Sequence, residues 1–129
     1  MKIIEKKIIG YLRSSDFLSD SENYAKSKDL SIRDSVKLER TQKRVYLWSH
    51  CIFTLDKENN IKFSFQGWQT DTTKSRINAL IWEFYSCPAV IRQKNYQLIF
   101  SSSAGKFPIG SGEIYTIKNG KPEKVESVF

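Results

Sequence analysis

One stretch of the chain decides its fold: Gln66-Gly67-Trp68-Gln69-Thr70-Asp71-Thr72-Thr73-Lys74-Ser75-Arg76-Ile77-Asn78. It places a strand exit, a hydroxyl-rich turn and the start of a basic helix in direct succession. Apolar residues then recur at i, i+3, i+4 and i+7, which predicts an amphipathic helix over about residues 72–86 with the stripe Ile77, Leu80, Ile81 and Phe84. Thr70, Asp71 and Thr72 are all suitable caps for its start, and Cys87-Pro88 ends it.

Before this stretch, alternating apolar residues predict a β-hairpin over about residues 45–66. We expect one long strand from Arg44 to Leu55, a polar turn over 56–60 and a second strand from Ile61 to Gln66. The alternation assigns a core face to Val45, Leu47, Cys51, Phe53 and Leu55, with Phe63 and Phe65 opposite them. The other face would carry Tyr46, Trp48 and His50 beside Lys62, Ser64 and Gln66.

After the helix, two further hairpins are predicted, over about 89–101 with a turn at Lys94-Asn95 and over about 113–125. The last closes on Asn119-Gly120, a pair typical of a type I′ turn. The composition of residues 101–112 indicates a flexible loop. Together the elements predict an α+β fold, an antiparallel sheet with one helix packed on one face.

The length of 129 residues predicts one domain. Within it, residues 1–44 are expected to form an N-terminal extension or an arm that contacts a partner. The isoleucine pairs near the start suit a helix or a strand up to Leu12, and the polar segment 14–34 suits a loop with one short helix, or a segment that orders on binding.

Composition narrows the classes of function. The net charge of +7 favours polyanions or acidic protein surfaces as partners, and the aromatic share of 13% exceeds what one small core needs to bury. Two cysteines and one histidine cannot form a four-ligand zinc site or a disulfide framework. We expect no metal and no cofactor, and a protein that is neither secreted nor inserted in a membrane but works in a reducing cytoplasm.

The residues suited to catalysis do not form a set. His50 and Cys51 are adjacent in a predicted strand, so their side chains point to opposite faces and cannot act as base and nucleophile. We therefore expect no catalytic residues and no enzymatic activity.

The first candidate binding site is the helix start. Its free N–H groups lie among the hydroxyls of Thr70, Thr72 and Thr73, with Trp68, Lys74 and Arg76 close by. These groups are suited to holding a phosphate. The alternative is that the threonines only cap the helix, Trp68 covers the sheet edge, and Lys74 and Arg76 are solvated.

The second candidate is the outer hairpin face, where Tyr46 and Trp48 alternate beside Arg44 and Lys62. Single-stranded nucleic acids bind platforms that combine aromatic rings and cations in this way. The alternative is that the N-terminal segment covers these aromatic rings as a second core layer.

The segment from Leu47 to Ala79 resembles small proteins of unassigned function from tailed-phage and prophage genomes. The shared pattern is two strands followed by Gly-Trp-x-Thr-x-Thr-Thr-Lys-x-Arg-Ile-Asn, here Gly67 to Asn78, and it extends more loosely to Phe100. The resemblance implies a phage or prophage origin and no particular mechanism. Residues 1–44 have no counterpart in it.

Two functions follow as expectations. The first is a non-enzymatic phage accessory protein that binds nucleic acid through the helix start and the aromatic hairpin face. The second is an inhibitor of a host defence system, such as an anti-CRISPR, or of host transcription, which binds a host protein directly and works in the bacterial cytoplasm.

Overall fold

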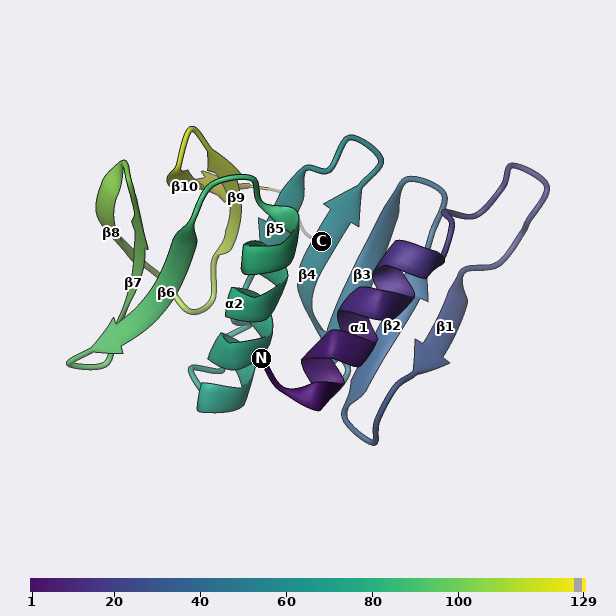
Figure 1. Ribbon diagram of the computed structural model, residues 1–129, viewed down its shortest axis with the longest axis horizontal. Helices are drawn as coiled ribbons and strands as arrows, with labels where there is room; N and C mark the ends of the chain where they lie inside the picture. The colour runs from purple at the N-terminus through teal and green to yellow at the C-terminus, as the bar shows by residue number, and fades with distance from the viewer. Residues whose placement is uncertain (127–128) are drawn as a thin grey trace.

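The computed structural model describes residues 1–126 and 129, which form two helices and ten strands (Figure 1). In chain order the elements are α1 (Ile3–Ser14), β1 (Lys26–Asp29), β2 (Asp34–Leu38), β3 (Gln42–Leu47), β4 (His50–Asp56), β5 (Ile61–Phe63), α2 (Asp71–Phe84), β6 (Ala89–Lys94), β7 (Gln97–Ser102), β8 (Gly105–Ile109), β9 (Ile114–Lys118) and β10 (Lys121–Val125). Seven strands form an antiparallel sheet in the order β1-β2-β3-β4-β5-β9-β10, and β6-β7-β8 form a second one. The predicted α+β class is confirmed.

Both helices cover the same face of the seven-stranded sheet (Figure 1). The predicted stripe of α2 is confirmed, since Ile77, Leu80 and Ile81 are buried and Phe84 packs against the core. Phe63 of the large sheet and Phe100 of the small sheet stack with ring centroids 6.3 Å apart, so one core joins the two sheets.

The predicted long strand from Arg44 to Leu55 is wrong. Trp48 and Ser49 form a tight turn with φ values of 50° and 66°, and the chain reverses into β4, with Leu47 paired to His50. The turn escapes prediction because neither residue is the Gly or Asn that such a conformation favours. A register shift between Val45 and Tyr46 then pairs Tyr46 with Cys51, so Cys51 lies on the outer face beside Tyr46 instead of on the core face.

Residues 3–14 are helical, which is one of the two forms expected up to Leu12. Two other segments differ from expectation. Lys26–Asp29 is a strand within the segment expected to be a loop with one short helix, and Gly105–Ile109 inside the predicted loop pairs with β7 as an edge strand. The hairpin turn after β6 is Asn95-Tyr96, one residue later than predicted, whereas Asn119-Gly120 closes β9 and β10 as expected.

The first 44 residues pack against the rest of the chain. Ile8 and Leu12 of α1 are buried in the core. Within the segment itself, Nζ of Lys43 donates to the carbonyl oxygens of Leu12, at 2.7 Å, and of Ser15. A cation at the end of a helix complements its dipole. Burial lowers the pKa of Lys43, an effect that Asp16 partly opposes.

Asn78 links α2 to the small sheet. Its amide donates to the carbonyl oxygen of Ile91 at 2.8 Å, and its carbonyl oxygen accepts from the N–H of Ile91 at 2.7 Å. The side chain thus makes the pair of bonds that a neighbouring strand would make along the free edge of β6.

Candidate functional site

A cavity of about 270 Å³ opens beside the N-terminal end of α2. Leu47, Ile52 and Phe65 contribute apolar side chains to its lining. The aromatic rings of Trp48, His50 and Trp68 and the threonines Thr70, Thr72 and Thr73 complete it. We refer to this set of nine residues as the Trp48/Trp68 pocket.

Trp48 is positioned by the β3–β4 turn. The N–H of Trp48 donates to the carbonyl oxygen of Arg33 at 2.8 Å, which fixes this turn against the neighbouring β1–β2 connection. The side chain stays 59% exposed, so the fold presents the indole to solvent.

Trp68 is positioned by a second turn. Gln66 and Gly67 have φ values of 52° and 81°, and the N–H of Trp68 donates to the carbonyl oxygen of Phe65 at 2.8 Å. Gly67 suits this left-handed conformation because it has no Cβ. The Trp68 ring is 56% exposed and lies 5.8 Å from the His50 ring, centroid to centroid.

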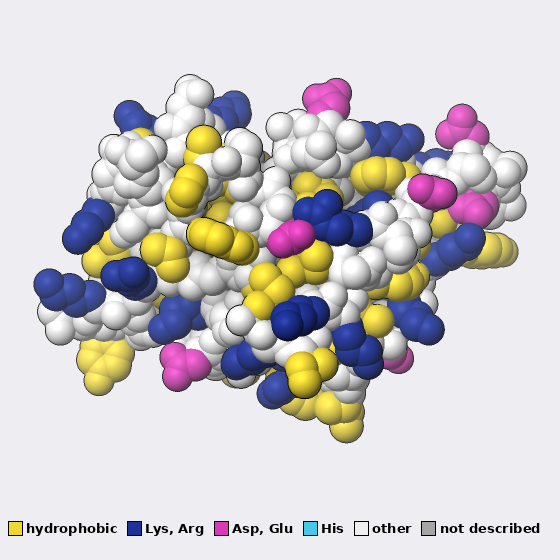
Figure 2. Space-filling model, viewed as in Figure 1, with side chains coloured by type: hydrophobic (Ala, Val, Ile, Leu, Met, Phe, Trp, Pro, Cys, Tyr) yellow, Lys and Arg dark blue, Asp and Glu magenta, His cyan; other side chains and the backbone are white. Residues whose placement is uncertain are grey.

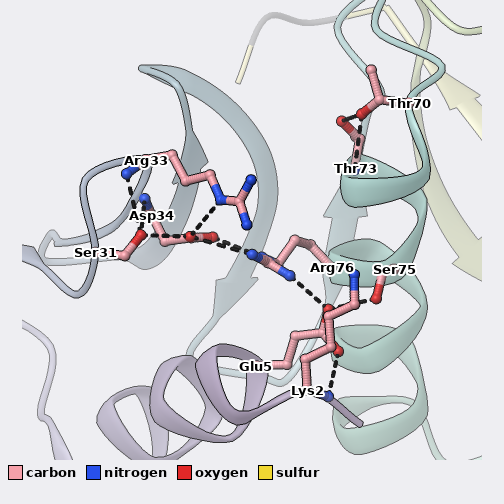
Figure 3. Close-up of polar contacts among 9 residues, drawn as sticks. All are labelled: Lys2, Glu5, Ser31, Arg33, Asp34, Thr70, Thr73, Ser75 and Arg76. Carbon is pink, nitrogen blue, oxygen red and sulfur yellow. Dashed lines mark hydrogen bonds and ion pairs between the residues drawn. The ribbon is translucent and has the colours of Figure 1, made fainter.

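The helix start beside these rings is capped by Thr70. Its hydroxyl accepts from the N–H of Thr73 at 3.1 Å and shares a 2.9 Å hydrogen bond with the Thr73 hydroxyl (Figure 3). This cap occupies a donor that the predicted phosphate site would need. Lys74, one turn into the helix, pairs with Asp71 at 3.4 Å.

Arg76 does not lie at the surface, and its expected exposure is wrong. Its side chain is 1% exposed and forms a buried cluster with Glu5 of α1 and Asp34 of β2, which we call the Arg76 cluster (Figure 3). Nε and Nη2 donate to the two Asp34 oxygens at 2.7 and 3.3 Å, and Nη1 donates to Glu5 at 2.8 Å. These charge-assisted bonds fix α2 to α1 and β2.

The electrostatics of the cluster favour its charged state. Burial raises the pKa of Glu5, but hydrogen bonds from Ser75 and the N–H of Lys2, together with Arg76, outweigh it and leave the pKa below its ordinary value. Burial lowers the pKa of Arg76, and the hydrogen bonds to Asp34 and Glu5 reverse this, so the pKa is raised.

Arg44, Tyr46 and Lys62 lie on the other side of the large sheet. Arg44 pairs with Thr54 across β3 and β4, and Thr54 pairs with Lys62 across β4 and β5. These pairings place Arg44 and Lys62 on the face away from Val45 and the helices, and Tyr46, two residues after Arg44, lies on the same face. Arg44 forms an ion pair with Glu39 at 3.0 Å. Trp48 was predicted to share the outer face with Arg44, Tyr46 and Lys62. In the structure it lies beside the helix start instead, and the other three do not.

Positive charge is concentrated at the end of the molecule where α1 and α2 begin. Lysine and arginine side chains predominate over the lower half of the molecule in Figure 2, around the start of α1 and the β6–β7 turn. Arg33 is exposed on the turn before β2, and Arg92 and Lys94 are exposed on β6, next to the β6–β7 turn. An anionic ligand at this end would therefore meet a favourable potential.

Two observations concern metal binding and the reactivity of Cys51. The described residues contain no group of three His, Cys, Asp or Glu side chains that could hold a metal ion. Burial raises the pKa of the Cys51 thiol, which makes its nucleophilic thiolate scarce. The pocket is suited to enclosing a flat apolar group between aromatic rings.

Five predicted site residues meet in the pocket, namely Trp48, Trp68, Thr70, Thr72 and Thr73. His50 was not predicted as a neighbour of Trp68, and Leu47, Ile52 and Phe65 were not predicted as lining. Recognition of the Trp48-Ser49 turn would have brought His50 to the same end of the sheet as Trp68.

Comparisons with known proteins place the chain in a family. A family model described as Kyanoviridae Gp96 protein matches residues 1–117. No curated protein and no solved structure matches the chain. No helix among the described residues is long and apolar enough to cross a membrane.

Proposed function

The chain belongs to the Kyanoviridae Gp96 family of phage proteins, and we propose that it binds single-stranded nucleic acid, with one unstacked base held in the Trp48/Trp68 pocket. The observation that carries the proposal is a pair of half-exposed tryptophans that line one apolar cavity. Lysine and arginine side chains are numerous at the same end of the molecule (Figure 2). Aromatic rings that stack on bases, combined with cations that follow the phosphates, are the usual components of single-strand binding. In the bacterial host the ligand would be a phage or host polynucleotide.

The dimensions and chemistry of the pocket support a single base as the occupant. Its 270 Å³ lies just below the roughly 300–1,000 Å³ of sites for drug-sized ligands, so one planar ring system is a suitable size. The hydroxyls of Thr70 and Thr72 offer hydrogen bonds to polar base edges. Duplexes should bind more weakly, because their base faces are already stacked.

Fluorescence anisotropy with a labelled single strand of about 12 nucleotides, within the known range of site sizes, tests the proposal. Trp48→Ala and Trp68→Ala should each weaken binding by roughly 5- to 150-fold, the range measured for loss of one stacking ring. Trp82→Ala is the matched control, since Trp82 is 67% exposed and does not line the pocket. An equal loss in all three variants, or no binding by the wild type at low salt, refutes the proposal.

Salt dependence gives an independent measure of phosphate binding. Lys74→Ala, beside the pocket, should reduce the slope of log affinity against log salt by about 0.7, the value expected when a protein neutralises one phosphate fewer on a single strand. Lys62→Ala removes the same charge from the opposite sheet face and should leave the slope unchanged.

A second candidate function, inhibition of a host defence or transcription protein, is favoured by a different cavity. A groove of about 670 Å³ between α2 and β6 is lined by Met1, Trp82, Val90 and Arg92 among others, and exposed tryptophan and arginine are frequent anchors of protein interfaces. Capture of one host protein from nuclease-treated lysate, abolished by Trp82→Ala, would support this function. Loss of every partner on nuclease treatment counts against it.

A further inference from the structure

Among the described residues, three hairpins have two-residue turns in which both residues have positive φ. The turns are Trp48-Ser49 at 50° and 66°, Asn95-Tyr96 at 50° and 65°, and Asn119-Gly120 at 52° and 77°. This conformation favours Asn followed by Gly, which have little or no steric penalty in it. One of the three turns uses that pair, and the other two hold an aromatic residue instead.

Stability of the fold does not account for these aromatic residues. A bulky side chain in the left-handed region is strained, and burial of the ring would be the usual compensation. Trp48 is 59% exposed and Tyr96 is 88% exposed, so little burial offsets the strain. Exposed rings held at strained positions indicate a role in binding.

The two aromatic turns lie at the same end of the molecule. Trp48 and Trp68 line one pocket, and Nε2 of Gln69, the residue after Trp68, donates to the carbonyl oxygen of Tyr96 at 2.9 Å. The Asn119-Gly120 turn lies at the other end of α2, where the N–H of Gly120 donates to the hydroxyl of Tyr85 at 2.9 Å (Figure 1). The strained turns thus coincide with the candidate site, and the unstrained turn is remote from it.

We infer that Tyr96 is a second stacking platform for the same single strand, which runs from the Trp48/Trp68 pocket across Gln69 to the β6–β7 turn. The inference rests on the proposed function and extends it from one base to at least two. Arg92 and Lys94, exposed on β6 next to this turn, are placed to contact the phosphates of the second segment. The occupant is a single-stranded polynucleotide, because exposed aromatic rings with cations beside them suit bases and phosphates.

Tyr96→Gly separates binding from folding. The substitution restores an Asn-Gly pair at the turn, so the variant should melt about 2–5 °C higher than the wild type. Its affinity for the labelled strand of about 12 nucleotides should nevertheless fall by roughly 5- to 150-fold. Tyr24→Ala removes another exposed tyrosine, in the segment before β1, and should change neither quantity.

The outcomes distinguish the two proposals when Trp48→Ala is measured in parallel. A more stable Tyr96→Gly variant with weakened binding supports the inference. Wild-type affinity in Tyr96→Gly, with binding still weakened in Trp48→Ala, overturns the second platform and leaves the proposed function intact. Absence of oligonucleotide binding by the wild type overturns both proposals. A host protein captured by the wild type but not by Tyr96→Gly would then assign Trp48, Trp68 and Tyr96 to the binding of a protein partner.

Discussion

Replacing Arg76 with methionine tests the buried cluster that joins α1, β2 and α2. Methionine fills much of the same volume without a charge, so the variant leaves Glu5 and Asp34 buried without their shared cation. Three charge-assisted hydrogen bonds disappear, two to Asp34 and one to Glu5. Arg33, 3.7 Å from Asp34 and partly exposed, compensates only that carboxylate.

The expected loss of stability is large for a single substitution. Removing one partner of a buried ion pair costs about 3–5 kcal/mol, because the remaining charge is left uncompensated. For a chain of this length that corresponds to a fall in Tm of about 10–20 °C. Arg13→Met, which removes the exposed ion pair with Glu83, should cost about 1 kcal/mol or less.

Urea denaturation followed by circular dichroism measures both variants. Adding Glu5→Gln and Asp34→Asn to Arg76→Met should recover part of the loss, because the orphaned charges are then removed. A cost below about 1 kcal/mol for Arg76→Met, or no recovery in the triple variant, would show that the cluster does not stabilise the fold through its ion pairs. The folded fraction of Arg76→Met should keep the salt dependence of the wild type, unlike a phosphate-binding arginine.

Two further predictions concern ionisable groups. The pKa of Glu5 is lowered in the folded state, so the stability that its carboxylate contributes is present above the unfolded-state pKa of about 4.3 and is lost as pH falls through the folded-state pKa. Glu5→Gln should therefore lose stability less steeply than the wild type below about pH 4.5. The urea midpoint measured against pH tests this. Burial raises the pKa of Cys51 while Cys87 is exposed, so a thiol reagent should label the native protein at Cys87, and Cys87→Ser should react only in denaturant. Rapid labelling of native Cys87→Ser contradicts the burial of Cys51.

The features predicted correctly from the sequence are those encoded locally. The stripe of α2 and the Asn119-Gly120 turn each depend on residues within a few positions of one another. The Trp48-Ser49 turn was missed because neither residue is the Gly or Asn that favours such a turn. Trp48 was therefore placed beside Tyr46 and Arg44 instead of beside Trp68. Tertiary structure overrides local preference at such a position.

The misplacement of Arg76 has a different cause. Its partners Asp34 and Glu5 are 42 and 71 residues away in sequence, so no local pattern shows that they converge on it. A basic residue on the first turns of a helix is expected to be solvated, and only the packing of α1 and β2 against α2 reveals otherwise. Capping of the helix by Thr70 could be predicted because it depends on the helix start itself.

The Arg76 cluster and the Trp48/Trp68 pocket share their supporting backbone. Asp34 follows Arg33, whose carbonyl oxygen holds the N–H of Trp48, and Arg76 lies one turn after Thr73 in α2. The buried ion pair between Asp34 and Arg76 therefore ties α2, which carries Thr72 and Thr73, to the start of β2, next to the residue that holds the Trp48 turn. A binding site keeps its geometry only when the residues behind it are fixed. Loss of the cluster should consequently weaken binding by loosening the pocket, without removing any group that contacts the ligand.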